Sequence, residues 1–162
     1  NDVLAGVVVT NSLELYEQLF YNLNTTGAVL SPFDSYQLIR GLKTLSLRME
    51  RSTANAREIV AYLEGSPAVK EVLYTGRGGM ISFKVADETR IPHILNSLRV
   101  FSFAESLGGV ESLITYPTTQ THADIPAEVR HSYGLTDDLL RLSIGIEDVR
   151  DLIADLRQAL EG

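Results

Sequence analysis

Near its C-terminus the chain reads Leu140-Arg141-Leu142-Ser143-Ile144-Gly145-Ile146, followed by the segment from Glu147 to Leu160. The first stretch alternates, which predicts a β-strand with aliphatic side chains on one face and with Arg141 and Ser143 on the other. The second stretch repeats its apolar residues at helical spacing, which predicts an amphipathic helix with one buried side. A strand and a helix of this kind favour an α+β domain at this end of the chain.

Upstream of this stretch the pattern predicts the rest of a small sheet. Runs with a period of two predict strands over 69–74, 80–85, 102–105 and 110–115, with a short helix over 87–100 and a polar loop over 117–126. The cluster Gly76-Arg77-Gly78-Gly79 lies between two strands and does not lead into a helix. Phosphate-binding loops take their anion affinity from a helix N-terminus, so a hairpin turn is favoured here.

A long helix is expected before the sheet. Ser31 is a candidate N-cap, Pro32 suits the first turn, and an apolar stripe continues as far as Gly65. The interpretation is a single helix over residues 31–64 that ties two regions together.

The N-terminal residues have a different pattern. The run from Val3 to Val9 is continuously apolar, which is typical of a strand buried on both faces. Asn11-Ser12 can then cap a helix that extends to Leu23. Residues 1–30 are therefore interpreted as the edge of a larger α/β domain.

Composition excludes several classes of function. The 162 residues carry 14 basic and 21 acidic side chains, a net charge of −7 that disfavours nucleic acid. The chain has no cysteine, hence no disulfide and no thiolate nucleophile, and its histidines His93, His122 and His131 lack metal-ligand spacing. No apolar run is long enough for a membrane span, and a cytoplasmic location is expected.

Two features could carry chemistry. Arg141 on a strand could hold a carboxylate through two parallel hydrogen bonds, although an exposed arginine would fit the same pattern. The segment from Glu105 to Ser112 combines two carboxylates, two hydroxyls and two glycines, which suits either a ligand or a tight turn. These residues alone do not define a function.

Several motifs along the chain are distinctive when taken together. They are Asp2-Val3-Leu4-Ala5-Gly6, Ser31-Pro32-Phe33-Asp34-Ser35-Tyr36, residues 40–45 and 48–50, residues 106–113, Thr121-His122-Ala123 and residues 140–148. Together they resemble the Cys/Met-metabolism family of pyridoxal-phosphate enzymes. The resemblance implies the α+β C-terminal small domain of a fold type I, aspartate aminotransferase-like transferase, a sheet with flanking helices plus a long linking helix. Residues 1–30 would be a remnant of the large cofactor-binding α/β domain, 31–64 the linking helix and 65–162 the C-terminal domain.

The resemblance also implies roles for five residues. Arg141 would grip the α-carboxylate of an amino-acid substrate, with the Leu107 backbone and the Thr121 hydroxyl in the same pocket. Ser106 would lie near the catalytic lysine and the substrate, and Glu105 by the distal end of the substrate. A glutamate at that position resembles cystathionine γ-synthases and cystathionine γ-lyases more than sulfhydrylases or methionine γ-lyases.

The resemblance therefore implies an enzyme that replaces the substituent at the γ carbon of a homoserine ester with cysteine. It also implies a homo-oligomer, which is a tetramer in the family. The alternatives are a cystathionine γ- or β-lyase, or a non-catalytic association domain that uses an apolar patch between Val3 and Phe20. No nucleic-acid, membrane or metal partner is expected.

The sequence departs from the family pattern in two places. The connection from Tyr74 to Gly79 is shorter than usual, which puts surface packing and assembly in question. The catalytic lysine and the other cofactor-binding groups are expected upstream of Asn1, because Lys43, Lys70 and Lys84 do not match the family's lysine position. No cofactor-binding residue is therefore expected in this chain, which by itself is expected to be inactive.

Overall fold

The computed structural model describes residues 2–162, so the first residue of the N-terminal region defined above lies outside it. The chain divides into two compact units between Ser46 and Leu47. In the part of the chain that the structure describes, no helix is both long and apolar enough to cross a bilayer.

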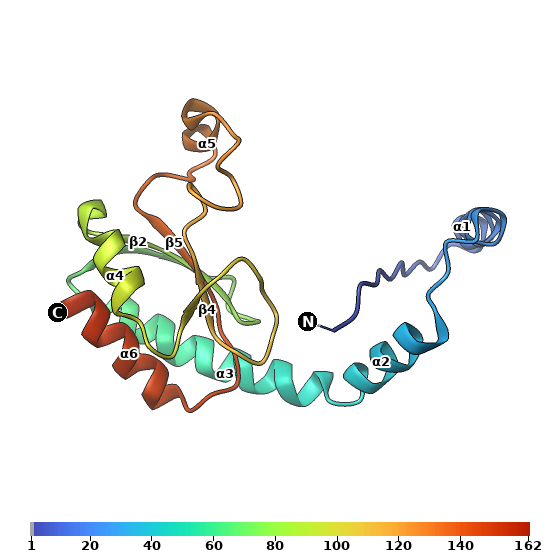
Figure 1. Cartoon of the computed structure of the whole chain (residues 1–162), viewed down its shortest axis with the longest axis horizontal. Helices are drawn as coiled ribbons and strands as arrows, with labels where there is room; N and C mark the ends of the chain where they lie inside the picture. The colour runs from blue at the N-terminus through green and yellow to red at the C-terminus, as the bar shows by residue number, and fades with distance from the viewer. Residues whose placement is uncertain (1) are drawn as a thin grey trace. The chain divides into compact units, whose positions relative to one another are not determined.

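The first unit contains two helices, α1 (Leu13–Thr26) and α2 (Pro32–Leu42) (Figure 1). The side chain of Ser12 accepts a hydrogen bond from Leu15 N, and that of Ser31 accepts one from Asp34 N. These bonds satisfy N–H groups that have no partner inside the helix. Both predicted helix starts are confirmed, whereas α1 continues beyond Leu23 to Thr26, where Gly27, with a φ of 70°, caps it.

The predicted strand between Val3 and Val9 is absent from this structure. These residues form no regular element, and apart from the half-buried Val3 their large apolar side chains are exposed, Leu4 and Val9 being 95% and 87% accessible. A strand buried on both faces requires hydrogen-bonded neighbours and covering helices. The described strands all lie between Val69 and Ser143, so nothing in the first unit pairs with this run.

The prediction of one unbroken helix over 31–64 is wrong. After α2 the chain makes a turn at Lys43 and Thr44 before α3 (Leu45–Glu64) begins. In this turn Lys43 N donates to Arg40 O and Thr44 N to Gly41 O, each three residues back. Gly41 is a poor helix former and residues 41–47 are all exposed, so no packing compensates for its low helix propensity.

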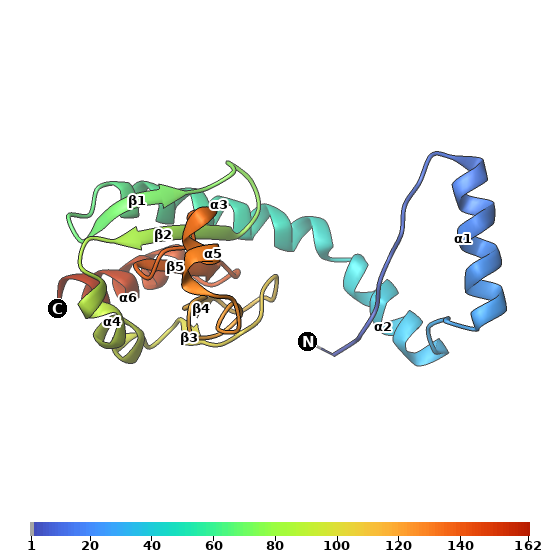
Figure 2. The ribbon, with the colours of Figure 1, turned by 90° about the horizontal axis from the view of Figure 1, so that it is seen from above.

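The second unit is built on a mixed five-stranded sheet in the order β1-β2-β5-β4-β3. The strands are β1 (Val69–Leu73), β2 (Met80–Val85), β3 (Ser102–Phe103), β4 (Leu113–Thr115) and β5 (Leu139–Ser143). β3 and β4 pair in parallel, and the other neighbours are antiparallel. The five strands predicted for this unit are all present, although β3 and β4 are shorter than predicted, and the alternating stretch forms the central strand (Figure 2).

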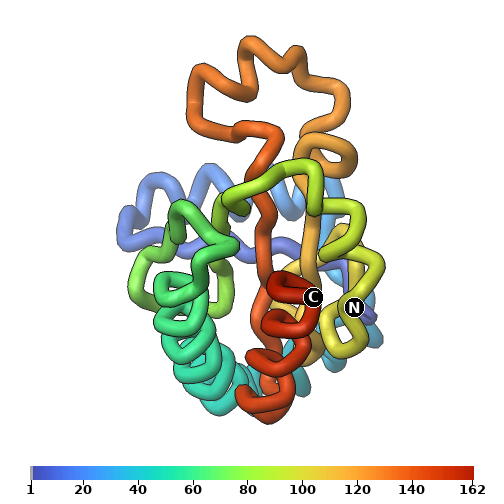
Figure 3. The backbone as a smooth tube through the Cα atoms, turned by 90° about the vertical axis from the view of Figure 1, so that its left-hand side faces the viewer, coloured from blue at the N-terminus to red at the C-terminus, as the bar shows by residue number. Residues whose placement is uncertain are grey.

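Three helices cover one face of this sheet. α3 and α6 (Val149–Glu161) lie side by side along it (Figure 3), where Tyr62 donates to Glu161 and the Arg157 guanidinium lies over the Tyr62 ring. α4 (Ile91–Ser97), which follows the short 3₁₀ turn η1 (Glu88–Arg90), contributes to the same core. The predicted aliphatic face of β5 is confirmed at Leu140 and Leu142, which are completely buried, whereas the strand ends at Ser143, and Ile146, predicted on the same face, is exposed.

Two connections between strands include the predicted turn and the predicted polar loop. The glycine cluster forms the predicted turn between the antiparallel strands β1 and β2, where Gly76 and Gly78 have φ values of 85° and 76°. Residues 116–138 leave the sheet on the side away from α3 and α6 (Figures 1 and 3). This excursion contains the predicted polar loop and a short helix, α5 (Ala127–Ser132), which the sequence pattern did not indicate.

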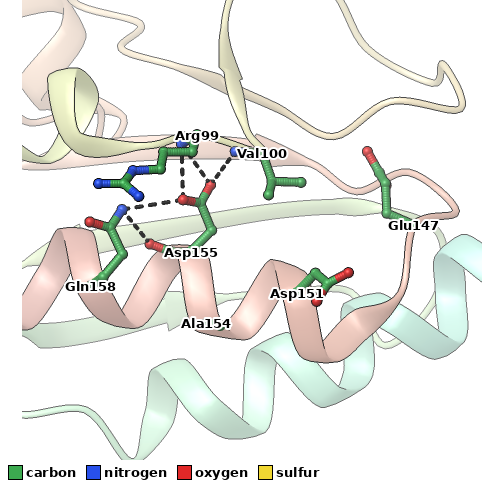
Figure 4. A pocket seen from close by; sticks show the side chains of 7 residues that line it. All are labelled: Arg99, Val100, Glu147, Asp151, Ala154, Asp155 and Gln158. Atoms are coloured by element: carbon green, nitrogen blue, oxygen red, sulfur yellow. Dashed lines mark hydrogen bonds between the residues drawn. The ribbon is translucent and has the colours of Figure 1, made fainter.

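A buried carboxylate holds the segment that joins α4 to β3. Asp155 of α6 is 5% exposed and accepts hydrogen bonds from the backbone N–H groups of Arg99, Val100 and Phe101, at 2.8–3.1 Å. Gln158 also donates to it, and Figure 4 shows Asp155 and Gln158 with Arg99 and Val100 in the lining of a surface pocket. The carboxylate thus satisfies three N–H groups that belong to no helix or strand ladder.

A second carboxylate, Asp138, makes folding dependent on pH. Burial raises its pKa, but hydrogen bonds from Lys70 and Thr136 outweigh burial and hold the pKa below its usual range. A carboxyl with a lowered pKa in the folded state stabilises the protein above about pH 4, and that stabilisation is lost as the pH falls through the folded-state pKa.

We therefore expect Asp138→Asn to lower the free energy of unfolding at pH 7 and to have a smaller effect at pH 3. Urea unfolding of wild type and variant at both values measures the difference. An equal loss at the two values would contradict the ionic contribution of Asp138.

Candidate functional site

The candidate site is on the sheet face that the helices leave uncovered, with Arg141 of β5 at its centre. Arg141 lies in register with Ser82 of β2 on one side and with Thr115 of β4 on the other. It is half-buried, and its Nη2 lies 3.4 Å from Thr115 Oγ1, to which it donates a hydrogen bond. The neighbouring strands therefore restrict the guanidinium to the middle of this face.

Arg141 lines a surface pocket between the sheet and the excursion of residues 116–138. The pocket is lined by Leu73, Ser82, Pro117, His122, Tyr133, Gly134, Leu135, Leu139 and Arg141. Its lining combines one guanidinium, one imidazole and two hydroxyls with apolar walls, and none of these lining residues carries a carboxylate. This composition favours an anionic group of a ligand, which the planar guanidinium can bind through two hydrogen bonds.

The loop from Glu105 to Ser112 is attached to the same strand. Gly108 N donates to the Oγ of Ser143 at 2.9 Å, and Ser143 is on the same face of β5 as Arg141. Neighbouring residues on the same face of a strand are about 7 Å apart, so the loop backbone at Gly108 is held at the position next to Arg141 on that face. Ser106 is half-buried, whereas the Glu105 and Leu107 side chains are exposed.

Thr121 is exposed within the excursion. Its Oγ1 forms a hydrogen bond of 2.7 Å with Nδ1 of His122, and of these two residues it is His122 that lines the pocket with Arg141. The lining of this pocket includes neither Thr121 nor the loop residues Glu105, Ser106 and Leu107. Their roles beside Arg141 stay predictions.

Sequence reasoning did not identify Ser82, His122 or Tyr133 as neighbours of Arg141. The alternation of β2 does put Ser82 on the other face of the sheet from the buried Ile81 and Phe83, so the face of Ser82 was predictable from the sequence. Its position beside Arg141, however, depends on the pairing of β2 with β5. For His122 and Tyr133 no local pattern was available, because the path of the excursion brings them to the pocket.

The two lysines of the second unit are engaged elsewhere. Lys70 of β1 forms an ion pair with Asp138, and Lys84 of β2 forms one with its cross-strand partner Glu71, with 2.7 Å between Nζ and Oε2. The described pocket therefore offers an anion-binding arginine but no lysine amine in its lining.

Comparison with known proteins identifies relatives over the whole chain. Cystathionine gamma-synthase/O-acetylhomoserine (thiol)-lyase of Bacillus subtilis is 54% identical over 160 residues, which are 99% of this chain and 43% of that protein. Cystathionine gamma-synthase of Haemophilus influenzae is 54% identical over 159 residues, 98% of this chain and 43% of that protein. Cystathionine gamma-lyase of Bacillus subtilis is 49% identical over 177 aligned positions, 99% of this chain and 47% of that protein.

A solved structure shows the same fold. Cystathionine gamma synthase from Xanthomonas oryzae pv. oryzae, in complex with aminoacrylate and cysteine, matches with a TM-score of 0.87 and 41% identity, over 94% of this chain and 44% of that one. This match confirms the predicted fold class, the α+β C-terminal domain of a pyridoxal-phosphate-dependent transferase. The chain spans less than half the length of these relatives.

The family model described as "Cys/Met metabolism PLP-dependent enzyme" matches residues 1–161. This match covers all but one residue of the chain and includes β5, the pocket and the loop. The chain belongs to the Cys/Met-metabolism family of pyridoxal-phosphate-dependent enzymes.

Proposed function

We propose that this chain is the C-terminal portion of a transsulfuration enzyme that uses pyridoxal phosphate. The full-length enzyme would replace the γ substituent of a homoserine ester with the thiol of cysteine, which is the reaction of a cystathionine γ-synthase. The observation that carries this proposal is Arg141 on the central strand, in a pocket without carboxylates.

In this proposal the chain binds and orients the amino acid. Arg141 would hold the α-carboxylate through two parallel hydrogen bonds, in an orientation restricted by its bond to Thr115. Fixing the carboxylate fixes the direction in which the reacting carbons point, which is how binding energy contributes to rate. Pyridoxal phosphate, when bound, supplies the electron sink for this chemistry.

The loop residues and Thr121 would complete the binding of the substrate. The Leu107 backbone and the Thr121 hydroxyl would donate to the carboxylate, and Ser106 would lie near the catalytic lysine. Glu105, exposed at the start of the loop, would lie near the distal end of the substrate. The hydrogen bond between Gly108 N and Ser143, which ties this loop to β5, supports this group of assignments.

The lengths of the alignments favour a synthase over a lyase. The two relatives named as γ-synthases align over 160 and 159 residues, within the 162 of this chain. The γ-lyase aligns over 177 positions, 15 more than the chain contains, so it has residues that this chain lacks. The short connection between Tyr74 and Gly79 is the place where the sequence departs from the longer family pattern, and here it closes a compact hairpin.

The lysine that holds the cofactor is proposed to lie in a part of the enzyme beyond these 162 residues. Lys70 and Lys84 are both ion-paired, and Lys43 caps the C-terminus of α2 in the first unit. The residues present therefore fit the carboxylate of a substrate better than the cofactor itself. A homo-oligomer and a cytoplasmic location are part of the same proposal.

An association domain without catalysis is the second candidate. It is favoured by the large apolar side chains that the first unit exposes, among them Leu4, Val9 and Phe20. If the parent reading frame encodes a lysine-bearing cofactor domain upstream, this second candidate fails.

The proposed activity is tested with the full-length enzyme. Supplied with an acylated homoserine and cysteine, it is expected to form cystathionine at least tenfold faster than it degrades cystathionine supplied alone, and the isolated 162-residue chain should do neither. Chromatography of both reactions measures the two rates. Faster degradation would replace the synthase proposal with a lyase, and activity of the isolated chain would contradict the position proposed for the lysine.

A further inference from the structure

The loop between Glu105 and Ser112 is held at several points, of which the first is a single hydroxyl. Ser143 is 3% exposed, and its Oγ accepts the hydrogen bond from Gly108 N at 2.9 Å. Gly108 has a φ of 73°, so the loop turns at this residue in a conformation that favours glycine. The serine hydroxyl therefore fixes the backbone at the tip of the turn, immediately after Leu107.

The second point is a buried network at the end of β5. Ser112 donates to Glu147 from both its backbone N and its Oγ, at 2.6 and 2.9 Å, and the same Oγ accepts from Gly145 N at 2.9 Å. Asn55 of α3, which is 1% exposed, donates to the carbonyl oxygens of Gly145 and Glu147. This network connects the end of the loop to a helix of the core.

Close backbone packing leaves the loop no room to shift between these points. Ile146 N donates to Val110 O at 2.9 Å, and a Cβ atom placed on Gly145 would lie 2.1 Å from that same carbonyl oxygen. Such an approach is possible only at glycine. The network thus sets where the loop ends, and the bond from Gly108 N to Ser143 Oγ helps to set where its tip lies relative to Arg141.

We propose that Ser143 is a positioning residue for the substrate carboxylate. It acts through the loop, because it fixes the backbone of Leu107 and Gly108 beside Arg141, two residues away on the same strand face. This inference rests on the proposed function, since it takes Arg141 as the carboxylate-binding group. Without the hydroxyl, the tip of the loop loses its hydrogen bond to β5 and can shift relative to the arginine, while the network at Ser112 keeps the end of the loop in place.

The test is Ser143→Ala in the full-length enzyme, with Ser66→Ala as the matched control. Ser66 is also buried, at 7% exposure, and its Oγ accepts a backbone hydrogen bond from Ala68 N at the connection of α3 to β1. We expect Ser143→Ala to raise KM for the amino-acid substrate about tenfold, the value of one lost hydrogen bond, with kcat changed less than threefold. Ser66→Ala should change neither constant by more than about twofold.

Amide hydrogen exchange gives a second measurement that does not depend on activity. Peptides covering residues 105–112 should exchange faster in Ser143→Ala than in wild type, whereas peptides from α3 and α6 should not. If Ser143→Ala does not fold, Ser143→Cys keeps the size of the side chain with a weaker acceptor, and the same changes are expected at smaller amplitude. An unchanged KM in the folded variant, or a KM change equal to that of Ser66→Ala, would overturn the inference.

The wild-type assay separates this inference from the proposed function. If wild type forms no cystathionine, the proposed function fails. If wild type is active and Ser143→Ala has normal kinetics, only the role of Ser143 fails.

Discussion

Asp155→Ala is expected to lower the free energy of unfolding by about 4 kcal/mol, the largest effect on stability that we predict for a single residue of the second unit. The carboxylate is 5% exposed and accepts from Arg99, Val100 and Phe101 N–H groups. Hydrogen bonds to a charged group each contribute about 1.5–3 kcal/mol, and a buried donor left without a partner costs about 1–3 kcal/mol. Part of this loss is recovered, since water can reach the exposed residues Arg99 and Val100.

Two variants isolate the role of the Asp155 carboxylate. Asp155→Asn keeps one acceptor oxygen and should lose about half as much stability as alanine. Asp151→Ala removes an exposed carboxylate one turn earlier in α6 and should cost no more than about 1 kcal/mol. Denaturant unfolding followed by circular dichroism measures all three. Equal losses for Asp155→Ala and Asp151→Ala would show that the three N–H groups do not need the buried acceptor.

Arg141→Ala in the full-length enzyme is expected to reduce kcat/KM for the amino-acid substrate by about 10²- to 10³-fold. Removing one member of a hydrogen-bonded charge pair costs about 2–5 kcal/mol, and each 1.4 kcal/mol corresponds to a factor of ten. The affinity for pyridoxal phosphate should change less than about threefold, because the proposal assigns to Arg141 the substrate and not the cofactor. Steady-state kinetics and a cofactor titration measure the two effects.

Substitutions of two arginines provide the controls for this prediction. Arg141→Lys keeps the charge but loses the planar fork, so it should recover only part of the activity. Arg150→Ala removes an arginine of α6 whose side chain is 86% exposed and is paired with the N-cap residue Asp148, and it should leave kcat/KM within about twofold. Comparable losses of substrate and cofactor affinity in Arg141→Ala would contradict the carboxylate role.

The elements that sequence reasoning predicted best carry their own periodicity and cap. The alternation over 140–146 corresponds to β5, and the apolar stripe from Glu147 onward to α6, with Asp148 as its N-cap. The sequence also identified both caps of the first unit, Ser12 and Ser31, because a cap is a contact between residues three apart. Local contacts of this kind depend little on the rest of the fold.

The elements that were predicted incorrectly depend instead on contacts with other segments. The apolar run between Val3 and Val9 has the composition of a buried strand but no partner among the described residues. The helix predicted over 31–64 breaks at Lys43 and Thr44, in a segment that is exposed throughout. Apolar residues indicate that a segment can be buried, but whether it is buried depends on another segment that packs against it.

The candidate site likewise has features that depend on local sequence and features that depend on tertiary structure. The sequence alone determined which face of β5 Arg141 occupies, because side chains alternate along a strand whatever its neighbours are. Only the tertiary structure decided that Thr115 and Ser82 flank the guanidinium and that His122 shares its pocket. It also decided that Ser143 holds the loop at Gly108, 35 residues away along the chain. Pairing of distant strands is a cooperative result of the whole core, and no local pattern of residues encodes it.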